Sequence, residues 1–157
     1  MFEQFSDEAR SAVGSAHEEV RMRGDRRLGT EHLFLGLLPA AGVARAVDVD
    51  PVAARVALDG LDRAALAVVG IDDRGVERVA VPASRKRTPF TSGARSVIKR
   101  SVVEAQRSGS RRIEAEHLLL AILSCERPDP AAELVDTLHI DRSAVRDRLR
   151  TGPGSDA

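Results

Sequence analysis

The chain has 157 residues, which is the size of one ordinary domain and long enough to bury a sizeable core. Hydrophobic residues make up 43% and charged residues 31%, while the aromatic share of 3% points to a core of Ala, Val and Leu and favours helices. Lysine plus arginine equals aspartate plus glutamate at 24 each, so no global field attracts nucleic acid or an acidic membrane. We therefore expect a globular helical protein that binds neither.

Cys125 is the one cysteine, which excludes an intramolecular disulfide and is typical of a reducing compartment. The start, MFEQFSDEAR, is charged from its third residue and lacks an apolar signal segment. No run approaches the roughly 20 apolar residues that a membrane span requires. These features predict a cytoplasmic protein.

In the first half, Ser6 is a favourable N-cap for a helix that ends at Gly24. Thr30 is expected to cap the second helix, which Pro39 ends. A short helix over residues 43–47 should follow.

Asp50 before Pro51 combines an N-cap with a first-turn proline and predicts a helix to about Val68. From residue 69 to residue 88 helical periodicity disappears, and charge, Gly and Pro prevail. This connector is interpreted as an exposed mobile linker. A short extended segment is the alternative, because three valines alternate with polar residues: Val76, Val79 and Val81.

A repeated motif organises the whole chain. LGTEHLFLGLL at residues 28–38 returns as IEAEHLLLAIL at residues 113–123, an offset of 85 residues, and the same offset places Phe5 on Phe90. Such a fixed register indicates duplication. Thr91 should then cap the first helix of the second half, with further helices at residues 118–123, 131–138 and 143–149. We predict an all-α domain at residues 1–150, with two pseudo-twofold related four-helix repeats at 1–68 and 90–150, a connector at 69–89, and a disordered tail at 151–157.

The motifs FxxxAR and GTEHLLLGLL resemble the N-terminal domain of Clp-type AAA+ unfoldases, most closely the ClpC branch. The resemblance covers about residues 1–150 and implies a Clp N-domain fold of about eight helices that docks substrates and adaptor proteins. These 157 residues contain no GxxxxGK[ST] phosphate loop. We expect a stand-alone N-domain protein without ATPase modules, with a fragment of a longer chain as the alternative.

Some ClpC-type N-domains bind phosphorylated arginine, and the resemblance assigns that ligand to four positions. Glu31 and Glu116 would pair with the guanidinium group, and the helix starts at Ser6 and Thr91 would hold the phosphoryl group. The same residues are also explained as ordinary helix caps and first-turn acids.

The second repeat departs from the family pattern at two positions. Glu114 and Ala115 replace Gly and Thr. We therefore expect the cap of that helix to be lost, at a cost of roughly 1 kcal/mol, and the two half-sites to differ.

A second candidate surface, which the resemblance links to cyclic peptides and adaptors, consists of Phe2, Phe90 and Arg95. The alternative is that Phe90 and Phe5 are equivalent core anchors. His32 and His117 lack the HExxH spacing of a zinc site and are interpreted as packing and capping residues.

No arrangement of nucleophile and base is recognisable, so we expect no enzyme activity, no metal and no cofactor. The predicted function is a non-catalytic protein- and peptide-binding module of Clp protein quality control, acting as a monomer. Its partners would be clients, adaptors or the Clp machine itself, by delivery or as a decoy. One alternative is sequestration of cyclic peptide antibiotics that target ClpC. Another is a DNA-associated regulator that uses the basic cluster Arg85, Lys86 and Arg87.

Overall fold

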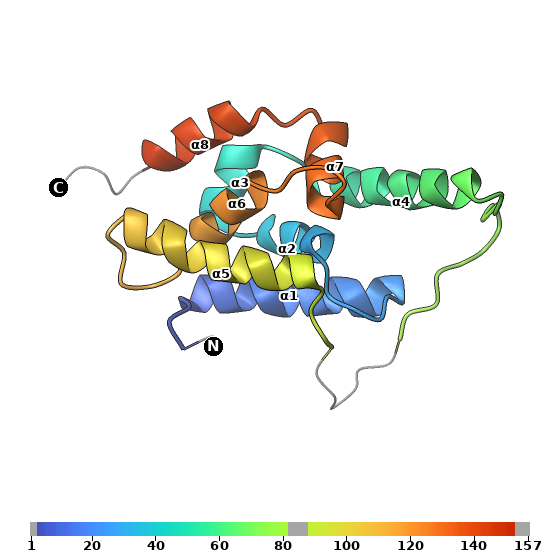
Figure 1. Cartoon of the computed structure of the whole chain (residues 1–157), viewed down its shortest axis with the longest axis horizontal. Coiled ribbons are helices and arrows are strands. Elements are labelled where there is room, and N and C mark those ends of the chain that lie inside the picture. The colour runs from blue at the N-terminus through green and yellow to red at the C-terminus, as the bar shows by residue number, and fades with distance from the viewer. Residues whose placement is uncertain (1–2, 82–87, 153–157) are drawn as a thin grey trace.

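The computed structural model describes residues 3–81 and 88–152 (Figure 1). These residues form eight helices and no strand, which confirms the all-α prediction. In chain order the helices are α1 (Asp7–Arg23), α2 (Thr30–Leu37), α3 (Ala41–Val47), α4 (Pro51–Val68), α5 (Ser92–Arg107), α6 (Ala115–Leu123), α7 (Pro130–Thr137) and α8 (Arg142–Arg150).

Each half of the chain is centred on a helix pair. Helix α1 packs on α2, and α5 packs on α6, while α2 and α6 meet between the pairs. Two isolated parallel bridges join the halves, Phe5 with Ile113 and Leu28 with Phe90. The 85-residue offset converts one bridge into the other. The halves are therefore related by a pseudo-twofold operation.

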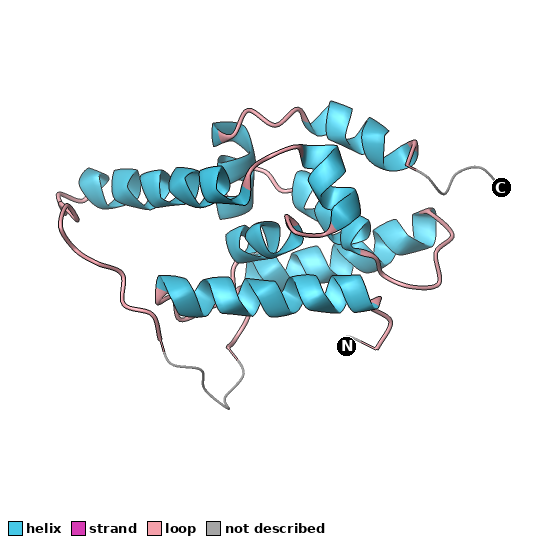
Figure 2. Ribbon diagram, turned by 180° about the vertical axis from the view of Figure 1, so that it is seen from behind, coloured by secondary structure: helices cyan, strands magenta, loops and turns pink. Residues whose placement is uncertain are grey.

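The remaining helices cross between the halves. Helix α3 packs on α8 and α6, and α4 packs on α7 and α2. The inner part of α4 is anchored by the buried side chains of Ala54 and Leu58, and its far end extends beyond the body of the molecule (Figures 1 and 2). One continuous apolar cluster, which includes Phe5, Phe34 and Leu118, runs through both repeats.

The first helix of each repeat is capped as the sequence predicts. The Ser6 hydroxyl accepts the Ala9 N–H, and the Thr91 hydroxyl accepts the Ala94 N–H, both at 3.1 Å. These caps satisfy backbone groups that a helix start otherwise leaves unpaired. They also fix the entry points of α1 and α5.

The prediction that Thr30 caps α2 is wrong. The N-cap is Gly29, and Thr30 is the first helical residue. The Thr30 hydroxyl instead donates to Asp129 Oδ1 at 2.9 Å and accepts the Ala131 N–H at 3.2 Å. Thr30 therefore joins α2 to the start of α7. Its hydroxyl bonds to residues about a hundred positions later in the chain and does not cap its own helix.

The expected loss of a cap at α6 is also wrong. In both repeats the histidine after the glutamate provides the cap: His32 Nδ1 accepts the Gly29 N–H, and His117 Nδ1 accepts the Glu114 N–H, each at 2.9 Å. Because no hydroxyl caps α2 either, the change to Glu and Ala in the second repeat removes no cap.

The described parts of the connector, residues 69–81 and 88–89, contain no strand and are largely exposed. The first of these parts is nevertheless attached to the first repeat. The Val81 N–H donates to the Arg21 carbonyl at 2.9 Å, and the Arg78 guanidinium contacts Asp62 at 2.5 Å. The predicted basic cluster at residues 85–87 and the end of the predicted tail, residues 153–157, lie outside the described residues.

Among the described helices, none has both the length and the apolar character needed to cross a membrane.

Candidate docking site

Backbone hydrogen bonds connect the helix start of each repeat to the glutamate-containing motif of the other repeat. The Ser6 N–H donates to the Ile113 carbonyl at 3.0 Å, three residues before Glu116. Correspondingly, the Thr91 N–H donates to the Leu28 carbonyl at 2.9 Å, three residues before Glu31. We call Glu31 with Thr91 the first half-site and Glu116 with Ser6 the second half-site. Each half-site thus combines the two repeats.

Glu31 is mostly buried, with 19% of its side chain exposed. Its Oε2 atom is buried and has no hydrogen-bond partner among the described residues. Burial raises the pKa of Glu31 above its ordinary value, and the carboxylates of Asp25 and Asp62 act in the same direction, against the opposing effect of His32. Glu31 is therefore a largely buried carboxylate, and one of its two oxygens has no hydrogen bond within the described residues.

Hydrogen bonds to both ring nitrogens orient His32 beside Glu31. Its Nδ1 accepts the Gly29 N–H, so its proton is on Nε2, which donates to Asp25 Oδ2 at 2.8 Å. Glu31 Oε1 lies 3.5 Å from Nδ1, which is longer than a usual hydrogen bond. The imidazole thus orients the start of α2, and within the described residues it gives Glu31 Oε2 no hydrogen bond.

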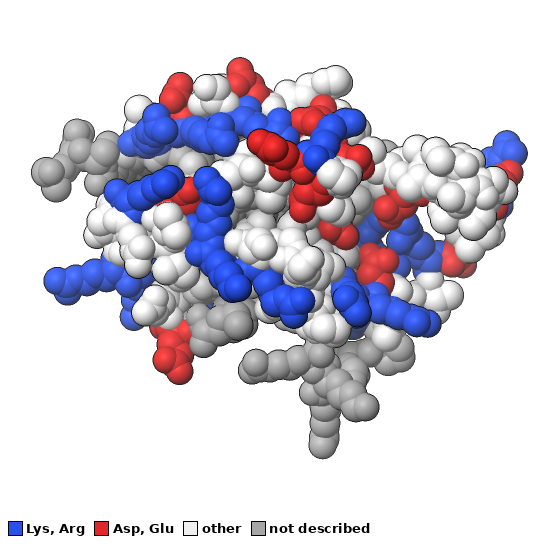
Figure 3. All heavy atoms as spheres, in the orientation of Figure 1, with Lys and Arg blue, Asp and Glu red and all other residues white. Residues whose placement is uncertain are grey.

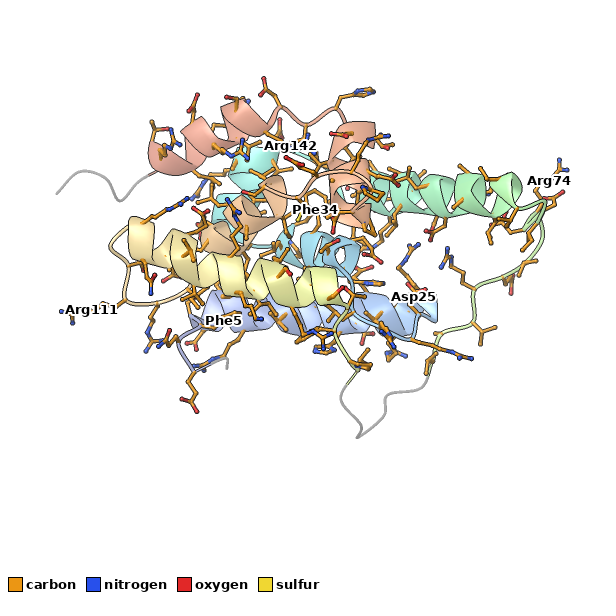
Figure 4. The ribbon with its side chains drawn as sticks, in the orientation of Figure 1. Phe5, Asp25, Phe34, Arg74, Arg111 and Arg142 are labelled. Atoms are coloured by element: carbon orange, nitrogen blue, oxygen red, sulfur yellow. The ribbon has the colours of Figure 1, made fainter. Side chains whose placement is uncertain are left out.

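An ion-pair network borders the first half-site. Arg23 is buried, with 7% of its side chain exposed, and contacts Asp59 at 2.9 Å and Asp62 at 2.7 Å. Arg78 of the connector joins Asp62 from the other side, and Asp25 lies at the end of α1 beside this network (Figure 4). Sequence reasoning missed these residues, because none of them belongs to the repeated motif.

Asp129 lies beside the N-terminal turn of α5, on the phosphate side of the first half-site. A Cβ at Gly93 would lie 3.2 Å from Asp129 Oδ2, which places that carboxylate against the turn. An incoming phosphoryl group would meet its negative charge there. The sequence signal for Asp129 is its place before Pro130, which matches that of Asp50 before Pro51, and Asp129 caps α7.

The second half-site lies at the start of α3. Glu8 Oε1 accepts the Ala41 N–H at 3.1 Å, which gives α3 a cap from another helix. The Glu116 carboxylate packs against Gly42, where a Cβ would collide with Glu116 Oε1. Position 42 therefore needs a glycine for Glu116 to keep its place.

His117 holds the start of α6 as His32 holds α2, with a different partner. Its Nε2 lies 2.8 Å from the Ser108 hydroxyl, which itself donates to the Ala105 carbonyl at 2.9 Å. Ser108 therefore accepts from His117. Burial lowers the pKa of His117, which keeps the ring neutral, against the opposing effect of Glu114. The Ser108 hydroxyl thus takes the place beside His117 that the Asp25 carboxylate takes beside His32. The second half-site therefore has one negative charge fewer than the first at this position.

Glu116 also lines an open cavity of about 1140 Å³ between α3, α5, α6 and α8. Arginines outnumber glutamates on its walls. Blue side chains gather over α8 and α5 on this part of the molecule, with red side chains between them (Figure 3). The surroundings of the two half-sites have therefore diverged, toward acidic at Glu31 and toward basic at Glu116.

The second predicted surface is described only in part. Phe90 is half-buried, with its ring 5.7 Å from that of His17, whereas Phe5 is fully buried, so the two phenylalanines are not equivalent core anchors. Arg95 is exposed on α5. Phe2 lies outside the described residues, and the cyclic-peptide surface stays a prediction.

Within residues 3–81 and 88–152, no group of three or more histidine, cysteine, aspartate or glutamate side chains is arranged to hold a metal ion.

Comparison with known proteins adds an independent observation. The family model described as the Clp repeat (R) N-terminal domain matches residues 4–138 and again residues 89–151. The chain is 33% identical over 154 residues to the chloroplastic chaperone protein ClpC2 of Oryza sativa, with 95% of this chain covered. It is equally 33% identical over 151 residues to a ClpA homolog of Porphyra purpurea, an ATP-binding subunit of the Clp protease. It spans only 15% and 16% of the length of these curated relatives.

Solved structures show the same fold at lower identity. The N-terminal domain of the chaperone ClpD from Arabidopsis thaliana superimposes with a TM-score of 0.70 at 17% identity, covering 96% of this chain and 95% of that one. The Hsp104 N-terminal domain from Candida albicans gives 0.65 at 16% identity, covering 98% and 93%.

Proposed function

This chain belongs to the family of Clp repeat N-terminal domains, and on that premise we propose that it is a non-catalytic docking domain for protein and peptide clients or adaptors of a Clp machine. In this role it delivers clients, competes for them or sequesters peptides. We further propose that its ligands include peptides that carry phosphoarginine. Glu31 is the residue on which this proposal rests.

The supporting observation is the buried Oε2 atom of Glu31, which has no hydrogen-bond partner within the described residues. A buried carboxylate oxygen without a partner is unfavourable, so a guanidinium group that pairs with it gains a charge-assisted hydrogen bond and removes that penalty. The start of α5, which Thr91 caps, adjoins it through the Leu28 contact and offers backbone N–H groups to an anion. Asp129 opposes that anion, so the first half-site favours the guanidinium part of the ligand.

The proposal is tested by calorimetric titration of the chain with free phosphoarginine and with a phosphoarginine peptide. Glu31→Gln keeps the size of the side chain and removes its charge, and we expect it to weaken binding at the first half-site about tenfold or more. Glu116→Gln should weaken the second half-site separately.

The control is Glu126→Gln, because Glu126 is exposed and lies outside both half-sites. Free arginine, added as a competitor, separates recognition of the guanidinium from recognition of the phosphoryl group. A flat titration with phosphoarginine and with the peptide would contradict the proposed ligand. Equal affinities of the wild-type chain and Glu31→Gln would remove Glu31 from the site.

A further inference from the structure

The cavity at the second half-site concentrates positive charge. Its walls carry six arginines and four glutamates, in a chain whose net charge is zero. The arginines come from α3, α5 and α8: Arg45, Arg100, Arg107, Arg146, Arg148 and Arg150. Three separate helices thus direct cations into one space, which sets this cavity apart from a solvated charge run along a single helix.

Two of these arginines are held in place by carbonyl groups, and neither has an ion pair in the described part of the chain. Arg146 Nη2 donates to the Leu123 carbonyl at 2.9 Å, and Arg148 Nη1 donates to the Ala46 carbonyl at 2.8 Å. Both acceptors are neutral carbonyls near the ends of α6 and α3. Because a guanidinium group has five N–H donors, each arginine keeps donors for a ligand. The cations are therefore positioned before a ligand arrives.

The carboxylates of the cavity are partly engaged. Glu104 has 13% of its side chain exposed and lies 3.7 Å from both Arg100 and Arg107, whose side chains are 51% and 68% exposed. Glu8 caps α3. Arg45 makes no hydrogen bond or ion pair within the described residues, and Arg150 only approaches Asp147 at 3.9 Å. Positive charge is therefore left available to a ligand.

We infer that this cavity binds an acidic polypeptide segment of a client or adaptor. The inference rests on the proposed docking function, because Glu116 is part of the cavity wall. Glutamate and aspartate side chains pair with guanidinium groups through charge-assisted and often bidentate hydrogen bonds. At about 1140 Å³ the cavity also exceeds the range of roughly 300–1,000 Å³ that is typical of small-molecule sites.

The walls favour a polypeptide over a nucleic acid. Glu114 and Glu116 interrupt the positive surface, and Leu120 and Leu149 add apolar area. A polypeptide can place acidic residues opposite arginines and small apolar residues elsewhere. A nucleic acid presents a phosphate at every nucleotide, so some phosphates would face the carboxylates.

The test measures fluorescence anisotropy of a short labelled peptide of alternating glutamate and alanine, without phosphoarginine. We expect saturable binding at about 50 mM salt that weakens at about 200 mM. The double variant Arg45→Glu with Arg150→Glu should bind about tenfold more weakly, since each reversed charge removes one pair and adds one repulsion. Both residues are exposed, so the variant should fold, and thermal melting checks this. If the reversals unfold the chain, Arg45→Ala with Arg150→Ala replaces them.

The matched control is Arg26→Glu with Arg27→Glu, which makes the same change in net charge at two exposed residues outside the cavity. Equal weakening by both double variants, or no saturable binding at low salt, overturns the inference. Single-stranded DNA with the same number of negative charges as the peptide is compared with it, and tighter binding of this DNA overturns the inference in favour of a nucleic acid. Titration of the same variants with phosphoarginine distinguishes the two proposals. Acidic-peptide binding that fails while phosphoarginine binding persists contradicts this inference alone, and the opposite result contradicts the phosphoarginine proposal alone.

Discussion

Glu31 illustrates how a single side chain can be unfavourable for folding and useful for binding. Its carboxylate is held at the start of α2 by local geometry, because Gly29 leaves room for it and His32 caps the same turn. None of these contacts gives Oε2 a hydrogen bond. A protein that keeps such a group at the surface of a docking site gives up folding stability for ligand binding.

The pKa of Glu31 predicts a pH-dependent effect of Glu31→Gln. Because this pKa is raised by burial in the folded chain, the unfolded carboxylate ionises first as the pH rises, and folding stability falls from the ordinary pKa of 4.5 upward. Glutamine lacks this ionisation. We expect Glu31→Gln to raise the free energy of unfolding at pH 7 by about 1 kcal/mol, and the gain to vanish below about pH 4. Urea unfolding across this pH range measures it.

Glu126→Gln is the control and should show no pH-dependent difference from the wild-type chain. A Glu31→Gln variant that is less stable than the wild-type chain at pH 7 would mean that the carboxylate has a favourable partner in the folded state. A gain in stability would also ensure that any loss of ligand binding by this variant is not caused by unfolding.

At the scale of the helices, α1 and α2 approach each other closely at Gly36. A Cβ at this position would collide with the backbone of α1 at Ala12 and Ala16. The corresponding residue of the second repeat is Ala121, so α5 and α6 accommodate the methyl group that α1 and α2 exclude. The two helix pairs thus have related sequences, but α1 and α2 leave less room at this position than α5 and α6 do.

This close approach predicts opposite effects for two glycine substitutions. Gly36→Ala should lower the free energy of unfolding by about 1–3 kcal/mol, because the extra methyl group forces α1 away from α2. Gly14→Ala should raise it by about 0.5–1 kcal/mol, because Gly14 is a helical residue with open space around its Cα. Chemical unfolding of both variants checks the pair. A neutral Gly36→Ala would show that the helices can separate at little cost.

At the scale of the whole molecule, the two repeats are interlocked. The crossed contacts of α3 with α8 and of α4 with α7, and the two bridges, all join one half to the other. Neither half buries its apolar residues alone. We therefore expect the chain to unfold as one cooperative unit.

Leu134→Ala tests this cooperativity. Leu134 is fully buried on α7, which packs on α2 and α4 of the first repeat. Its truncation should lower the free energy of unfolding by about 2–5 kcal/mol. Native-state hydrogen exchange should then show similar losses of protection in α1 and in α5. A loss confined to the second repeat would mean that the halves unfold independently.

Much of this protein could be predicted from its sequence. The duplicated motif gave the repeats and their offset, and the caps Ser6 and Thr91 marked the starts of α1 and α5. Helix periodicity gave the all-α class. These features depend on residues that lie within one or two helical turns of each other. Helix propensity and capping act between such neighbours along the chain. The sequence also indicated the two glutamates through their place in the repeated motif.

Only the tertiary structure decided how these residues are combined. It bonds the backbone of Thr91 to Leu28 and that of Ser6 to Ile113 across the repeats, and it gives the Thr30 hydroxyl to Asp129. Within the described residues it also leaves Glu31 Oε2 without a hydrogen bond. It also gathers arginines from three helices around Glu116. The physical reason is that hydrogen bonds, burial and ion pairs depend on which residues meet in space. The deciding partners here lie tens of residues away, where no local pattern records them.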